Sequence, residues 1–208
     1  MAETATSAPT DLEQILGYQG AVDDHPDADH PEVERVADEL HLLRFWTPSF
    51  CATVIRAAEA TGAFEPHPDD PVPGFEVSLA VISPRLFEAV QVDIGTRVWP
   101  RLQEIWPLIE YRGLRDAFVI RYRAGEQESL RLHQDIAQIS ATVRLNDGYR
   151  GADLHFPRQG YVADSMPVGS MLVWPSLVTH PHEATPLESG VKYGLTVWCE
   201  LPDDSVVW

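Results

Sequence analysis

Histidine and aspartate residues in two distant segments have the types and the spacing of a metal site. His133 and Asp135 are separated by one residue, so in an extended segment their side chains point to the same face and can reach one cation. A third ligand must come from elsewhere in the fold, and residues 180–183 supply His180 and His182 just before the last predicted strand. Two histidines and one carboxylate with open coordination positions are the ligands of non-haem Fe(II) oxygenases.

A lysine extends this pattern. Lys192 follows His182 by ten residues and lies on the last predicted strand. A dicarboxylic co-substrate that chelates a metal through its 2-oxo acid end needs a fixed positive charge at its far end, and a lysine beside a ligand histidine can supply it. Each residue alone has an ordinary explanation, as a half-buried histidine, a turn aspartate or a surface lysine. Both motifs in this order favour the metal site.

The first half of the chain is predicted to be helical. Thr47 as N-cap, a proline after it and a glycine stop predict a helix over residues 47–62. Residues 75–82 alternate enough for a strand, and Ser-Pro then starts a second helical stretch over residues 83–106. Pro100 should break or restart that helix.

The second half of the chain is predicted to be β-structure. After Gly113 the hydrophobic period changes from near four to two. Short β-branched or aromatic runs bounded by turn residues predict strands at residues 117–122, 139–145, 152–156, 171–174 and 193–201. Helices followed by many short strands, without β-α-β alternation, predict a mostly β fold of two sheets with helices on one side, as in jelly rolls.

One domain with an extension is expected for a chain of 208 residues, since domains take about 100–200 residues each. Residues 1–33 are acidic and broken by prolines, which predicts a partly mobile N-terminal extension, with a short docked helix as an option at residues 12–18. His25 and His30 lie among carboxylates there, and a solvated tail is favoured over a metal site. Residues 34–208 then form a single domain, with helical support at 47–110 and a jelly-roll core at 115–201.

Composition and charge restrict the classes of function. With 44% apolar and 9% aromatic residues the composition is that of an ordinary globular protein. The formal net charge of −17 disfavours binding to nucleic acid or to anionic membranes. Two cysteines are too few for a disulfide framework, and they form no CxxC pair for a structural zinc. The N-terminal residues lack the basic and apolar regions of a secretory leader, so we expect a soluble, cytoplasmic protein, either monomeric or a homodimer.

The sequence between residues 115 and 201 also resembles a known family, the Fe(II)/2-oxoglutarate-dependent dioxygenases of the prolyl/lysyl hydroxylase group. It is particularly similar to the catalytic domain of procollagen lysyl hydroxylases. The fold that this resemblance implies is a double-stranded β-helix (a jelly-roll or cupin-like core). The similar segments are residues 118–127, 129–135, 151–156 and 177–193.

The resemblance implies roles for individual residues. It implies iron ligation by His133, Asp135 and His182, because the family's ligand histidine lies ten residues before the basic residue. It also implies binding of 2-oxoglutarate by Lys192 with Tyr122.

Two positions depart from the family pattern. A lysine stands at position 192 where lysyl hydroxylases carry arginine, although prolyl hydroxylases use lysine. Leu154 stands where prolyl hydroxylases place a threonine that helps to hold the co-substrate, and we expect Thr142 to compensate.

The implied activity is that of a dioxygenase that uses Fe(II), 2-oxoglutarate and O₂, with ascorbate as a candidate reductant, and that releases succinate and CO₂. We expect it to hydroxylate an unactivated C–H bond of a free amino acid or related small natural product, with a cationic group on the substrate. A peptidyl or protein prolyl or lysyl hydroxylase is the alternative. A non-catalytic metal-binding β domain, or a zinc hydrolase with the same ligands, is the third.

Overall fold

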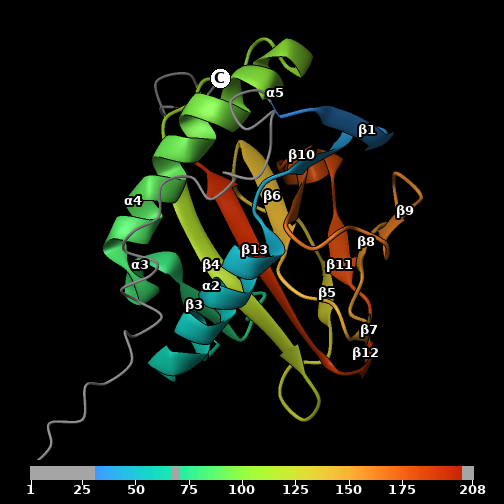
Figure 1. Cartoon of the computed structure of the whole chain (residues 1–208). Helices are drawn as coiled ribbons and strands as arrows, with labels where there is room; N and C mark the ends of the chain where they lie inside the picture. Colours follow the sequence, from blue (N-terminus) through green and yellow to red (C-terminus); the bar gives the residue numbers. More distant parts are fainter. Residues whose placement is uncertain (1–30, 67–70, 203–208) are drawn as a thin grey trace, which may run out of the picture.

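The computed structural model describes residues 31–66 and 71–202, which form two antiparallel β-sheets packed face to face with helices on one side (Figure 1). The large sheet has seven strands and the small sheet four. In spatial order the large sheet contains β1 (Val33–Ala37), β2 (Leu40–Arg44), β10 (Ser170–Pro175), β6 (Ile139–Arg144), β13 (Val191–Cys199), β4 (Leu114–Arg123) and β3 (Glu76–Ser78). The small sheet contains β5 (Leu130–His133), β11 (His182–Ala184), β8 (Leu154–Phe156) and β9 (Tyr161–Ala163).

A short antiparallel pair of strands, β7 (Arg150–Gly151) and β12 (Leu187–Ser189), lies beside the small sheet (Figure 1). The predicted mostly β fold with a double-stranded β-helix core and flanking helices is confirmed. All five predicted strands of the second half are present, with shifted ends. The predicted strand at residues 152–156 is shorter than expected, because Ala152 has a φ of 51° and separates β7 from β8.

The helices cover the outer face of the large sheet (Figure 1). They are α2 (Pro48–Thr61), α3 (Leu79–Ile82), α4 (Pro84–Asp93) and α5 (Trp99–Ile105), and a π-helical turn (Ile94–Val98) joins the last two. The predicted start and stop of α2 are confirmed, because the Thr47 hydroxyl accepts a hydrogen bond from the Phe50 amide at 3.3 Å and Gly62 takes a left-handed φ of 61°. The main hydrophobic core lies between these helices and the sheet.

One prediction for the helical half needs correction. The strand predicted at residues 75–82 ends at Ser78, whose side chain accepts a hydrogen bond from the Ala80 amide and caps α3. The four residues after it are apolar and carry no helix-specific period, so the sequence pattern did not reveal the change. The prediction that Pro100 breaks or restarts the helix is confirmed in its second form, because Pro100 lies in the first turn of α5, directly after the π-helical turn.

The first described strand lies at the predicted boundary between the N-terminal extension and the domain. β1 begins at Val33, the last residue assigned to the extension, and pairs with Leu43 of β2. Strands β1 and β2 were not predicted. The proposed helix at residues 12–18 and the histidines at 25 and 30 lie outside the described residues.

Strand alternation positions the side chains that face the small sheet. On β13, Tyr193 and Leu195 point to the helices and belong to the main core, whereas Lys192 and Thr196 face the space between the sheets.

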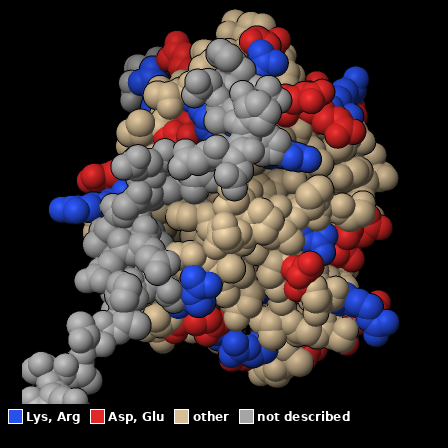
Figure 2. Space-filling view, in the orientation of Figure 1, with Lys and Arg blue, Asp and Glu red and all other residues tan. Residues whose placement is uncertain are grey.

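A broad uncharged area with charged side chains around its edge is visible on one face of the molecule (Figure 2). Among the described helices, none combines the length and the apolar composition that crossing a membrane requires.

Candidate metal and co-substrate site

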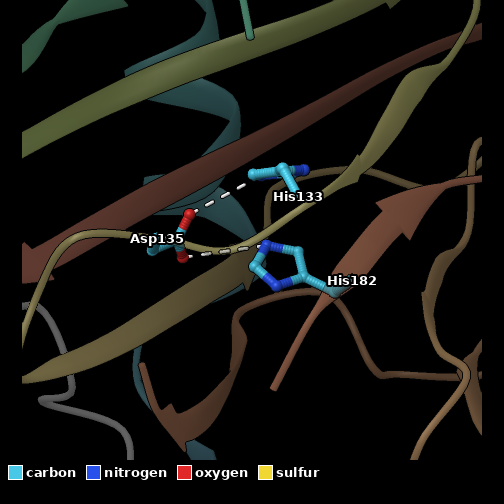
Figure 3. Close-up of side chains that lie close together, drawn as sticks. All are labelled: His133, Asp135 and His182. Atoms are coloured by element: carbon cyan, nitrogen blue, oxygen red, sulfur yellow. Dashed lines mark ion pairs between the residues drawn. The ribbon is translucent and has the colours of Figure 1, made fainter. Parts of the chain in front are cut away.

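The structure brings together the three residues of the predicted triad. His133 ends β5, Asp135 lies in the loop after it, and His182 begins β11. The antiparallel register of β5 and β11 places the two histidines opposite each other. One candidate ligand atom from each residue lies within 4.8 Å of the others (Figure 3).

Backbone hydrogen bonds fix which nitrogen of each imidazole faces the cluster. His133 Nδ1 lies 2.8 Å from the carbonyl oxygen of Arg131, and His182 Nδ1 lies 3.0 Å from that of His180. Only a protonated Nδ1 can donate to a carbonyl, so in each neutral ring the lone pair is on Nε2. Metal-bound histidines generally use such a bond to hold the ring.

The Nε2 atoms point at the carboxylate of Asp135. His133 Nε2 lies 3.6 Å from Oδ1 and His182 Nε2 lies 3.7 Å from Oδ2 (Figure 3). These separations are too long for good hydrogen bonds. Lone pairs that face one another across such a gap are favourable only when a cation or a proton lies between them.

Burial and mutual charge set the protonation of the cluster. Burial lowers the pKa of His182 below its ordinary value and so favours the neutral ring that a metal needs. Burial alone would raise the pKa of Asp135, but its interactions with His133 and His182 outweigh that effect and lower it. An ionised carboxylate between imidazoles is a suitable ligand set for a divalent metal.

The orphaned oxygen of Asp135 shows that these residues fit a metal ion. Asp135 is 4% exposed, and its Oδ2 has no hydrogen-bond partner. A buried carboxylate oxygen without a partner is unfavourable unless a cation compensates it. Two imidazoles and one carboxylate, with room on the cavity side, match the facial ligand set of Fe(II).

A cavity of about 510 Å³ extends from this cluster between the two sheets. The three triad residues line it, as do the other predicted site residues Tyr122, Thr142 and Lys192. The structure thus places all six predicted residues around one space. Most of the remaining wall is apolar or aromatic, with Phe118, Ile120, Leu154, Trp174 and Trp198 among its residues.

Lys192 is held in a low-polarity part of the wall. Its ammonium group donates a hydrogen bond to the carbonyl of Ala152 and lies 5.4 Å from the centre of the Tyr122 ring and 5.8 Å from that of Tyr149. Burial lowers the pKa of Lys192 to about 8. A carboxylate that entered the cavity would restore its charge.

Tyr122 and Thr142 lie on strands next to Lys192. Tyr122 is directly paired with Lys192 across β4 and β13, and Thr142 is paired with Thr196 across β6 and β13. Burial raises the pKa of Tyr122 above its ordinary value, so its hydroxyl stays protonated and can donate to a ligand.

His180 points away from the cluster. It is 2% exposed, its Nδ1 lies 2.9 Å from the Thr179 hydroxyl, and its Nε2 lies 3.4 Å from the carbonyl of Asp38. Its carbonyl, rather than its ring, contributes to the site by holding His182.

Several residues near the triad were missed from the sequence. The rings of Phe156 and Trp174 pack 5.3 and 5.1 Å from the His182 ring. The hydroxyls of Ser140 and Ser176 form a buried pair, and an interaction with Ser140 helps to lower the pKa of Asp135. Strand alternation could have placed Trp174 in the cavity, but no sequence signal pairs two distant serines.

Comparison with proteins of known sequence gives consistent relatives, although no family model matches the chain. The chain is 26% identical to rat multifunctional procollagen lysine hydroxylase and glycosyltransferase LH3 over 173 residues, 77% of this chain and 23% of that protein. It is 39% identical to human LH3 over 79 residues, 36% of this chain and 11% of the relative. The chain therefore spans less than a quarter of the length of these curated relatives.

Comparison with solved structures shows the same fold. A viral collagen prolyl hydroxylase from Paramecium bursaria Chlorella virus-1, solved with 2-oxoglutarate, has a TM-score of 0.60 at 17% identity, covering 79% of this chain and 97% of that one. A Trichoplax adhaerens prolyl hydroxylase in complex with a hypoxia-inducible factor peptide has a TM-score of 0.56 at 14% identity, covering 94% of each chain. The sequence matches are thus to procollagen lysine hydroxylases and the structural neighbours are prolyl hydroxylases, so this chain is similar to the prolyl/lysyl hydroxylase group of the Fe(II)/2-oxoglutarate-dependent dioxygenases.

Proposed function

We propose that this protein is a 2-oxoglutarate-dependent hydroxylase that acts on a prolyl or lysyl side chain within a peptide or protein. The observation that carries the proposal is the His133–Asp135–His182 cluster at a cavity whose wall also holds the buried cation Lys192. When bound, Fe(II) with 2-oxoglutarate and O₂ supplies the oxidant for an unactivated C–H bond, with succinate and CO₂ as co-products.

The chain's own residues have separate tasks in this proposal. His133 and His182 would hold the ion through Nε2, and Asp135 through Oδ2, the atom without a hydrogen-bond partner. Lys192 would exchange its bond to the Ala152 carbonyl for the far carboxylate of 2-oxoglutarate. Tyr122 would donate its hydroxyl proton in a hydrogen bond to the same group.

Apolar side chains of the large sheet would surround the reacting bond. Phe118 and Ile120 of β4 line the cavity together with the triad, and the Phe118 ring packs against that of Trp198, with 5.1 Å between the ring centres. Low polarity strengthens the attraction between Lys192 and a carboxylate. It also protects a reactive site from side reactions with solvent.

The comparisons favour a peptide over the free amino acid that the sequence analysis ranks first. The relatives are named as procollagen lysine hydroxylases, and the Trichoplax enzyme was solved with a peptide fragment. Both names refer to residues within a polypeptide.

The experiment that tests the proposal measures succinate formation by purified protein supplied with Fe(II), 2-oxoglutarate, ascorbate and O₂. One set of reactions contains free proline, lysine and other amino acids, and the other contains end-blocked peptides with a central proline or lysine. We expect stimulation by peptides and one added oxygen atom in their mass. Stimulation by free amino acids alone would replace the proposed peptide substrate with the small molecule. If no reaction forms succinate in a 2-oxoglutarate-dependent manner, the enzyme assignment is wrong.

A further inference from the structure

A small exposed apolar surface lies directly beside the metal cluster. It consists of Ile136, Leu177 and Val178, whose exposed fractions are 58%, 41% and 65%. We call these three residues the apolar ledge. The two segments that form it are joined by a hydrogen bond from the Leu177 amide to the Asp135 carbonyl at 3.1 Å. Exposed large apolar residues that lie together beside a cavity are typical of binding surfaces.

The backbone at the ledge is held in an unfavourable conformation. Leu177 has a φ of 62°, in the left-handed region that non-glycine residues seldom adopt. Such residues persist where surrounding structure fixes them, and they gather at ligand-binding sites. Burial of its own side chain does not explain the conformation of Leu177, because that side chain is exposed.

The ledge is continuous with the cavity. Ile136 directly follows Asp135 and lines the cavity together with His133 and Gln134. A polypeptide that placed one side chain in the cavity would continue outward over Ile136 and meet the ledge.

Two arginines bracket the ledge. Arg115 donates a hydrogen bond to the Ile136 carbonyl at 2.9 Å, and Arg158 donates one to the Val178 carbonyl at 2.8 Å. Both side chains are exposed. Neither forms a salt bridge within residues 31–66 and 71–202. Their remaining N–H groups can therefore receive a carboxylate from a partner.

We infer that the ledge and its two arginines bind the residues that flank the hydroxylation target in a substrate peptide, and that they select an apolar neighbour and an acidic residue beyond it. This inference rests on the proposed peptide hydroxylase. The ledge supplies apolar area next to the cavity, and the arginines supply positive charge at its ends. The net charge of −17 does not prevent this, because charges more than about 8 Å apart are largely screened at physiological ionic strength.

The inference revises the cationic substrate expected from net charge alone. The whole-chain charge reports the average surface, whereas a bound peptide responds to the groups within a few ångströms of it. At the ledge those groups include the guanidiniums of Arg115 and Arg158, together with the carboxylates of Asp38 and Glu39 near His180.

The test uses four pools of end-blocked peptides with a central proline and four with a central lysine. Within each set, the positions next to the target are either apolar or polar, and the positions beyond them are either acidic or basic. Mass spectrometry measures the fraction of each pool that gains one oxygen. We expect the apolar–acidic pool to be oxidised at least about fivefold faster than the polar–basic pool, the scale of effect that a few well-placed contacts provide.

Charge reversal at one arginine gives a sharper measurement. Arg158→Glu should reverse the order of the acidic and basic pools, and Arg115→Glu should act in the same direction. Val178→Ser should reduce the ratio between the apolar and polar pools. The matched control is Val92→Ser on α4, where the valine is 61% exposed on the helical side of the molecule. That control should preserve both ratios. Circular dichroism checks that each variant is folded.

The outcomes separate the two claims. Two outcomes would overturn the inference while the proposed function stands. One is equal oxidation of the four pools within each set, and the other is an unchanged acidic-to-basic ratio in folded Arg158→Glu. Oxidation of no pool by the wild-type protein would overturn the proposed peptide hydroxylase and this inference with it.

Discussion

The hydroxyl oxygens of Ser140 on β6 and Ser176 after β10 lie 2.7 Å apart, and both serines are buried. An interaction with Ser140 also helps to lower the pKa of the Asp135 carboxyl. Because an ionised carboxylate can only accept, a Ser140 hydroxyl turned toward it is the donor, and Ser176 then donates to Ser140. This arrangement would help to orient the carboxylate, whose Oδ2 has no hydrogen-bond partner among the described residues.

Ser140→Ala is expected to weaken metal binding by about 10–100-fold, the range seen when groups that orient metal ligands are removed. Calorimetric titration with Mn(II) would measure the affinity without requiring turnover. The matched control is Ser170→Ala, a buried serine on β10 outside this chain of hydroxyls. An Mn(II) affinity that is unchanged in folded Ser140→Ala would contradict the proposed orienting role.

His182→Ala should abolish stoichiometric metal binding and turnover, because it removes one of the three proposed protein ligands. His180→Ala should retain at least partial activity, since its imidazole bonds to Thr179 and the Asp38 carbonyl instead of the cluster. Metal content after dialysis and succinate formation would be measured for both variants. If His180→Ala lost its metal while His182→Ala kept it, the assignment of the ligand would be reversed.

Lys192→Ala should raise the KM for 2-oxoglutarate by well over tenfold. Removing one partner of a buried charge pair costs about 2–5 kcal/mol. Mn(II) binding in the absence of 2-oxoglutarate serves as the internal control, because Lys192 lies on the wall and not in the cluster. Lys192→Arg, which keeps the charge, should restore part of the affinity. A KM that stayed the same in Lys192→Ala would mean that another cation holds the co-substrate.

The affinity for 2-oxoglutarate should fall as the pH rises above about 8. The pKa of Lys192 in the free protein is about 8 because burial opposes its charge. Above that pH the dicarboxylate must bind together with a proton, so its Kd should rise by up to about tenfold per pH unit. The same group makes stability without ligand increase between pH 8 and the ordinary lysine range, because the unfolded chain binds the proton more tightly there. The Kd for 2-oxoglutarate and the free energy of unfolding would be measured at several pH values for wild type and for Lys192→Arg. A Kd that does not change with pH in the wild type would contradict the proposed effect of Lys192 protonation.

The sequence predicted the site better than it predicted the first half of the fold. Spacing alone paired His133 with Asp135, because side chains two apart in an extended segment share a face. The choice of His182 over His180 needed the family resemblance. In the structure the His180 ring contacts the Asp38 carbonyl, whereas the His182 ring is held by the His180 carbonyl with its other nitrogen toward Asp135.

Other features depended on contacts that no local pattern encodes. Strands β1 and β2 pair with each other locally, but β2 joins the sheet only through its pairing with β10, which lies far away in the chain, and both strands were missed. The change from strand to helix at Ser78 was hidden by an apolar run that suits either structure. The ledge was also invisible, since it depends on the hydrogen bond between Leu177 and Asp135.

The opposed pair His133 and His182 has a consequence for folding. These residues are aligned across β5 and β11, the edge strand of the small sheet and its only neighbour among the described strands. A metal bound by both would act as a cross-link between segments that are remote in the sequence, and binding only to the folded state stabilises it by mass action. The edge of the small sheet should therefore exchange its amide hydrogens more slowly when metal is present. Cellular supply of the metal would then influence how long the protein survives, as well as whether it is active.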